Sequence, residues 1–139
     1  MSNAIAIEEI SRVCATTAII METHCSLALE AIYRYGDDEQ KKKYVPDLAS
    51  GRKLASFALT EPMAGTDAAM QESTAILTDG EYILNGGKVF ITDGNYSDVF
   101  VVFAHFGSNR CRLSTSGPRL SDASCRPASA TDSESSRSM

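Results

Sequence analysis

The chain has 139 residues, a formal net charge of −5 and 43% apolar residues, which suffices for about one domain with a core. The acidic balance argues against nucleic-acid binding. No apolar run reaches the roughly 18 residues that cross a bilayer, and the N-terminus lacks the features of a signal or transit peptide.

Apolar residues recur every three or four positions from Ile5 to Ile32, which predicts one helix or a pair of helices with a broad apolar face. We expect a break at the β-branched pair Thr16-Thr17. Cys14 and Cys25 belong to no CxxC pair, and we expect both to be small core residues in a reducing compartment.

A second helix is predicted after Gly36, which suits the end of the first helical region. Asp37 and Gln40 have the spacing of a capping box. Pro46 should end or restart this helix. Residues 1–52 therefore form a predicted helical segment. His24 and His105 lie far apart in the sequence with no ligand cluster around either, so we expect no metal site.

After Gly51 the pattern changes to short apolar or alternating runs separated by turn residues. Asn85-Gly86 is a hairpin signal with a return strand after it. The predicted strands are 54–59, 73–78, 81–84, 88–92 and 99–103. Helices followed by antiparallel strands predict an α+β fold, with a partial β-domain over residues 53–106.

Residues 107–139 differ in composition from the rest of the chain. Residues 1–106 carry eight basic and 15 acidic residues, whereas residues 107–139 carry five Arg and three acidic residues. The latter segment also has ten Ser and no Ile, Val, Phe or Tyr. Such a segment cannot bury enough surface to offset its ordering entropy, so we expect residues 107–139 to be disordered.

The stretch "FALTEPMAGTDAAM", residues 57–70, begins as a strand and ends in small residues. Pro62 and Gly65 suit a plain tight turn. From these residues alone the plain turn is favoured, but a loop whose backbone amides approach a ligand is the alternative, because Gly65 has no side chain and Thr60 and Thr66 add hydroxyls. A second stretch, 90–92, adds an aromatic ring and a hydroxyl that could serve the same planar ligand.

Together, "FALTEPMAGTDAAM", "EYILNGGKVFIT" and "SDVFVVFA" closely resemble the middle of acyl-CoA dehydrogenases, which are FAD-dependent flavoproteins. "IAIEEISRV" and "YGDDEQKKKYVPDLASG" fit the same family in the same order. The short-chain (butyryl-CoA) branch looks nearest. The resemblance covers residues 5–106 and leaves 107–139 as a non-family tail.

The resemblance implies a role for each matched residue. Thr60 would hydrogen-bond the flavin ring, Thr66 would lie near the FAD pyrophosphate and the acyl-CoA, and Thr92 would lie close to flavin N5. Phe90 would lie beside the ring. The full set of implied cofactor-binding residues is Phe57, Leu59, Thr60, Gly65, Thr66, Phe90, Ile91 and Thr92, with Thr66 also binding substrate.

The resemblance also implies what the chain lacks. The catalytic base of the family lies in a C-terminal domain that has no counterpart here, so no residue is assigned as catalytic. Glu61 is a tempting base, but the family uses this position structurally. Three hypotheses follow: an inactive fragment of a short-chain acyl-CoA dehydrogenase, a non-catalytic fragment that docks on a full-length homologue, or a gene-prediction or cloning artefact.

The implied partners are an acyl-CoA substrate and an electron-transfer flavoprotein for the full-length family. Self-association, or association with a full-length homologue, is a further expectation. The implied location is the cytoplasm for a bacterial source and the mitochondrial matrix for a eukaryotic one.

Overall fold

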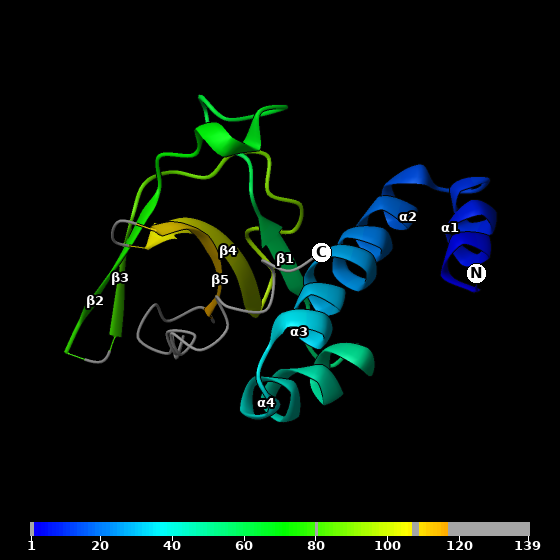
Figure 1. Ribbon diagram of the computed structural model, residues 1–139. Helices are drawn as coiled ribbons and strands as arrows, with labels where there is room; N and C mark the ends of the chain where they lie inside the picture. The colour runs from blue at the N-terminus through cyan, green and yellow to red at the C-terminus, as the bar shows by residue number, and fades with distance from the viewer. Residues whose placement is uncertain (1, 80, 107–108, 117–139) are drawn as a thin grey trace, which may run out of the picture.

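The computed structural model describes residues 2–79, 81–106 and 109–116. The later helices lie beside β1, the first two extend away from the sheet, and the hairpin of β2 and β3 lies at the opposite edge of the sheet (Figure 1). The helical elements are α1 (Ser2–Ser11), α2 (Ala15–Glu22), the π-helix η1 (Thr23–Leu29), α3 (Glu30–Tyr35) and α4 (Asp38–Ala49). Within the described residues, none of the helices is long and apolar enough to span a bilayer.

The first helical region breaks earlier than predicted. α1 ends at Ser11, and the amides of Val13 and Cys14 both donate to the Ile10 carbonyl, at 3.0 and 2.9 Å. Cys14 is extended and caps α2, so the predicted break at residues 16–17 is wrong. Cys14 is also exposed rather than buried, because it lies at this corner, whereas Cys25 is partly buried.

The start of α4 confirms the predicted capping box. The Gln40 amide donates to Asp37 Oδ1 at 2.8 Å, and the Asp37 amide donates to Gln40 Oε1 at 3.1 Å. The prediction that Pro46 ends the helix is wrong, since α4 continues to Ala49. Pro46 and Lys42 are both exposed, so water can replace the hydrogen bond that the proline removes.

In the described part of the chain, five strands form one sheet: β1 (Ala55–Ala58), β2 (Thr74–Thr78), β3 (Glu81–Asn85), β4 (Val99–Phe106) and β5 (Asn109–Ser116). The order is β1-β4-β2-β3, and β5 pairs with β4. β2–β3 and β4–β5 are antiparallel, but β1–β4 and β2–β4 are parallel. The α+β class is confirmed. The sheet is mixed rather than antiparallel, because long connections let β4 return in the direction of β1.

Two stretches differ from the predicted strands. Residues 88–92 are not a strand, although their apolar pattern predicted one. Residues 109–116, predicted to be disordered, form β5 along β4. A sheet edge needs only backbone donors and acceptors, which every non-proline residue supplies, so low apolar content did not exclude this strand. The remaining residues of the predicted tail, 107–108 and 117–139, lie outside the described residues.

Strand alternation gives the sheet two packed faces. The face toward the helices holds the main core, and the opposite face holds a smaller one around Ala104. The main core consists of Ala28, Ile32, Tyr44, Leu48, Ala55, Val99 and Val101. Because β1 contributes alternate residues to the two faces, Ala55 and Phe57 face the helices while Ser56 and Ala58 face the loops beyond.

His24 joins the helices to the sheet. Its Nδ1 accepts a hydrogen bond from the Ala55 amide at 3.0 Å, which leaves Nε2 to donate to the Leu48 carbonyl at 3.1 Å. The buried ring thus connects η1, the end of α4 and the start of β1. This structural role was not predicted from the sequence, where His24 stands alone.

We expect His24→Leu to lower the free energy of unfolding by about 1–3 kcal/mol, because it leaves the buried Ala55 amide without its acceptor and removes one of the two hydrogen bonds to the Leu48 carbonyl, which also accepts from the Gly51 amide. Urea unfolding followed by circular dichroism measures the change. The matched control is Lys42→Leu on the exposed side of α4, which should stay within about 0.5 kcal/mol of the parent. Equal stabilities of the two variants would contradict the assigned role.

Candidate functional site

Two long irregular connections meet at one end of the sheet. The first joins β1 to β2 and holds the short 3-10 helix η2 (Ala68–Met70); the second joins β3 to β4. Within the first, Glu61 and Ala64 exchange backbone hydrogen bonds of 3.0 and 3.1 Å, which closes the turn around Pro62. The predicted loop therefore begins with a tight turn, and Gly65 and Thr66 are exposed directly after it.

Glu61 anchors the first connection from within. Its side chain is only 5% exposed and accepts hydrogen bonds from the amides of Glu72 and Ser73 at 2.6 and 3.1 Å. The ammonium of Lys88 contacts Glu61 Oε1 at 2.7 Å. Each of these donors lies far from Glu61 in the sequence, so one carboxylate fixes the ends of both connections.

The environment of Glu61 favours its charged form. Burial opposes ionisation, but the hydrogen bonds from Lys88, from Ser73 and from the Glu72 and Ser73 amides outweigh it and lower the pKa of Glu61 to about 2. A carboxylate with so low a pKa is a poor proton acceptor near neutral pH. The geometry agrees with the structural role expected for this residue.

Segment 88–92 passes alongside the end of β1. The Val89 amide donates to the Thr60 carbonyl at 3.0 Å, and the Ser56 hydroxyl donates to the Thr92 carbonyl at 2.5 Å. Thr60, Ile91 and Thr92 are partly buried there, whereas Phe90 is 94% exposed. The structure thus brings together the two stretches that the sequence paired.

The site offers unused polar groups. Within the described residues, the side-chain hydroxyls of Thr60, Thr66 and Thr92 have no hydrogen-bond partner. A Cβ placed on Gly65 would meet no atom within 4 Å, so the backbone there is open to a ligand. Free hydroxyls, an open backbone turn and an exposed aromatic ring suit a planar, hydrogen-bonding group such as a flavin.

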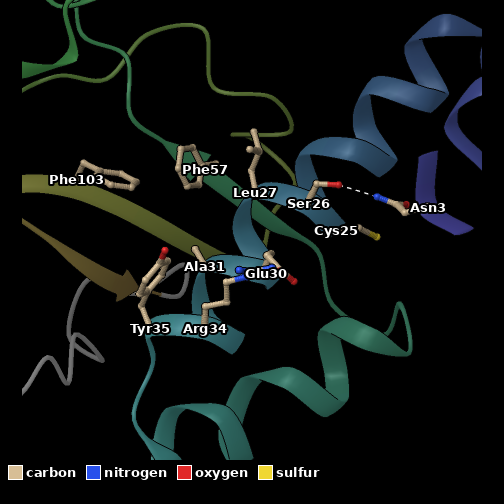
Figure 2. Close-up of a pocket in the computed structure, with 10 residues that line it drawn as sticks. All are labelled: Asn3, Cys25, Ser26, Leu27, Glu30, Ala31, Arg34, Tyr35, Phe57 and Phe103. Carbon is tan, nitrogen blue, oxygen red and sulfur yellow. Dashed lines mark hydrogen bonds and ion pairs between the residues drawn. The ribbon is translucent and has the colours of Figure 1, made fainter. Parts of the chain in front are cut away.

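Phe57 lies apart from this cluster. Its ring packs on Phe103 with centroids 4.9 Å apart, and both rings line a groove between the sheet and the helices (Figure 2). The groove has a volume of about 1060 Å³. Leu27, Ala31 and Tyr35 line its helical side. The Phe57 ring therefore faces the helices, while Leu59 continues toward the loop.

Three positioning side chains were not assigned a role from the sequence: Ser56, Lys88 and Ser97. Ser56 is fully buried, and its Oγ lies 2.6 Å from Ser97 Oγ. Lys88 belongs to the "EYILNGGKVFIT" motif, and a single lysine in this apolar stretch could have indicated a buried acidic partner. Nothing in the local pattern distinguishes the two serines.

The pattern of elements and the arrangement of these loops match known proteins. A model of the acyl-CoA dehydrogenase N-terminal domain matches residues 1–52, and one of the middle domain matches residues 56–117. The chain belongs to the acyl-CoA dehydrogenase family. The middle-domain match continues to residue 117, although the family resemblance was predicted to stop at Phe106.

Individual relatives agree with the short-chain branch. This acyl-CoA dehydrogenase chain is 47% identical over 104 residues to the short-chain-specific enzyme of Clostridium acetobutylicum, covering 75% of this chain and 27% of that protein. Against the human mitochondrial short-chain enzyme it is 43% identical over 104 residues, covering 75% and 25%. The chain thus spans about a quarter of these relatives.

Solved structures of acyl-CoA dehydrogenases also superpose on this chain. Butyryl-CoA dehydrogenase from Megasphaera elsdenii superposes with a TM-score of 0.76 at 36% identity, over 81% of this chain and 31% of that one. An acyl-CoA dehydrogenase from Bacillus anthracis, complexed with FAD, gives 0.70 at 39% identity, over 73% and 18%.

Acid should destabilise this chain through Glu61. Its pKa is about 2 in the folded protein against an ordinary value of 4.5, so its stabilisation is complete above pH 4.5 and is lost as the pH falls toward 2. The loss should be about 3 kcal/mol. Urea unfolding at several pH values measures it, and Glu61→Gln should flatten the dependence.

Asp47→Asn is the matched control for this pH series. Lys53 and Arg52 lower the pKa of Asp47, but the ion pairs are exposed and contribute little. This variant should keep the steep dependence of the parent below pH 4.5. A Glu61→Gln variant with the same steep dependence would contradict the assignment.

Proposed function

We propose that this chain forms one side of the FAD and acyl-CoA site of an acyl-CoA dehydrogenase that acts on short-chain thioesters. The observation that carries the proposal is the hydrogen bond from the Val89 amide to Thr60, which joins the turn after β1 to segment 88–92. This junction places Thr60 beside the segment that carries Phe90 and Thr92. When bound, FAD would accept the hydride that leaves the β-carbon of the acyl chain.

Different residues would bind the flavin ring, the pyrophosphate and the acyl-CoA. We assign the hydroxyls of Thr60 and Thr92 to polar atoms of the ring and the Phe90 side chain to its edge or face. The exposed residues Gly65 and Thr66, directly after the turn, suit the pyrophosphate and the acyl-CoA. Backbone groups of Leu59 and Ile91 would complete the contact, and Phe57 would support β1 from behind.

Among the residues that the structure describes, none has a side chain suited to remove the α-proton at this site. Glu61 is buried, accepts several hydrogen bonds and has a pKa of about 2. Asp67 is exposed and accepts a hydrogen bond from the Ala69 amide, which caps η2. We infer that the isolated chain does not dehydrogenate acyl-CoA, and that the base belongs to a part of the relatives outside the matched quarter.

A second role is docking on a full-length homologue. The apolar groove beside Phe57 and Phe103 favours it, because an open groove of about 1060 Å³ leaves apolar surface for another chain to cover. A colourless protein that co-purifies with a homologue would support docking, whereas a yellow protein supports flavin binding. For full-length relatives we propose electron-transfer flavoprotein as a partner. The mitochondrial human relative and the bacterial ones support the matrix or the cytoplasm, respectively, as the location.

Added FAD should bind the chain, and Phe90→Ala should weaken this binding about tenfold, because stacking on an aromatic ring contributes about 1–3 kcal/mol. Fluorescence titration of FAD measures the dissociation constant. Tyr96→Ala is the matched control, since Tyr96 is a nearby exposed aromatic, 79% accessible, with no assigned contact. Equal losses in both variants would count against a role for Phe90.

Butyryl-CoA should not be dehydrogenated by the chain, even with FAD added. Losing a positioned base costs about 10² to 10⁴ in rate, and losing the walls that orient the acyl chain costs several kcal/mol more. Anaerobic mixing with butyryl-CoA, followed at the oxidised flavin band, tests this. Bleaching that Glu61→Gln abolishes would overturn both the inactivity and the structural role of Glu61.

A further inference from the structure

Phe90 has an unusual backbone. Its φ is +57°, in the left-handed region that bulky side chains rarely adopt, and its ring is 94% exposed. Burial of the ring therefore does not compensate for the strain. A strained residue persists only where its surroundings over-determine it, so the source of the constraint must lie in the neighbouring residues.

Lys88 fixes the segment on the N-terminal side of Phe90. Its ammonium donates to the Leu59 carbonyl at 2.9 Å, to Glu61 Oε1 at 2.7 Å and to Gln71 Oε1 at 2.9 Å. An ammonium has three N–H donors, so all of them are used. The side chain is 12% exposed, and the Val89 amide adds its bond to Thr60 directly afterwards.

Ser56 fixes the segment on the C-terminal side. Its hydroxyl proton is committed to the Thr92 carbonyl at 2.5 Å, so Ser97 must donate the proton of the 2.6 Å bond between the two hydroxyls. Ser56 lies on β1 and is fully buried, which makes this anchor rigid. Phe90 stands midway between the two anchors.

We propose that Lys88 and Ser56 are positioning residues that hold Phe90 in its left-handed conformation, so that its ring is presented outward before any ligand arrives. The ligand that stacks against Phe90 is a planar heteroaromatic ring. Identifying this ring as the flavin of FAD rests on the proposed function. Neither side chain touches the ligand. Each acts through the backbone of segment 88–92, and a preset contact avoids the cost of ordering that segment on binding.

Amide hydrogen exchange of the full chain tests the anchors without any ligand. Lys88→Met should speed exchange of the Val89 amide at least tenfold, and Ser56→Ala should do the same for the Gly94 amide, which donates to Ile91. Lys53→Met and Ser11→Ala are the matched controls, since they lose an exposed ion pair and an exposed hydroxyl-to-carbonyl bond elsewhere. Wild-type exchange rates in the anchor variants would overturn the proposal.

The Lys88 variant leaves the Glu61 carboxylate buried without its cation. If Lys88→Met does not fold, the double variant with Glu61→Gln removes that charge, and Ser56→Ala alone still tests the second anchor. Faster exchange at Val89 in the double variant supports the proposal, and wild-type exchange there overturns it.

FAD titration then separates positioning from plain loss of stability. Leu48→Val weakens the helical core, to which neither Lys88 nor Ser56 contributes a side chain. The anchor variants should raise the dissociation constant for FAD about tenfold and shift the absorption band of bound FAD, while Leu48→Val changes neither. Losses equal to that of Leu48→Val would overturn the positioning role. Absence of FAD binding by the wild-type chain would instead overturn the proposed function. The exchange rates of the Val89 and Gly94 amides would still decide whether Lys88 and Ser56 hold segment 88–92.

Discussion

The buried pair of Glu61 and Lys88 is the contact on which the loop end of the structure depends. The connections from β1 to β2 and from β3 to β4 contain little regular structure, so their backbone groups cannot satisfy one another as strands do. Glu61 accepts from the amides of residues 72 and 73, and Lys88 donates to the carbonyl of residue 59. The pair thereby closes both connections onto the sheet.

The value of this pair lies less in its mutual attraction than in the backbone groups that it satisfies. Desolvating two charges costs several kcal/mol, and apolar pairs of similar volume are often as stable as a buried ion pair. Here, however, an apolar pair would leave two amides and a carbonyl without partners. Geometry, rather than strength, therefore explains why charged residues occupy these two buried positions.

Much of the fold could be predicted because its signals are local. The capping box at residues 37 and 40 and the strands predicted at 73–78 and 81–84 each depend on a few neighbouring residues, and they formed as expected. The hairpin predicted at Asn85-Gly86 is wrong, because its return strand, residues 88–92, does not form. The sequence also paired the turn after β1 with residues 90–92. The α+β class followed from the change of periodicity after Gly51.

The remaining features depend on contacts that no local pattern encodes. Residues 88–92 have an apolar run like that of a strand, but the Phe90 backbone is left-handed and the Thr92 carbonyl accepts from the Ser56 side chain, which prevents a regular ladder. β5 exists because β4 has a free edge. Parallel pairing of β1 with β4 is likewise a property of the whole chain, since it requires the intervening residues to travel back across the sheet.

β1 connects the apolar groove beside the helices with segment 88–92. Ala55 and Phe57 face the helices and the groove, while Ser56 between them points to the loops and holds Thr92. His24 fixes the start of the same strand. A strand of four residues has little freedom to shift one face without the other. Any partner that fills the groove must therefore contact the strand that sets the position of segment 88–92, so occupation of the groove and the geometry of segment 88–92 are linked through β1.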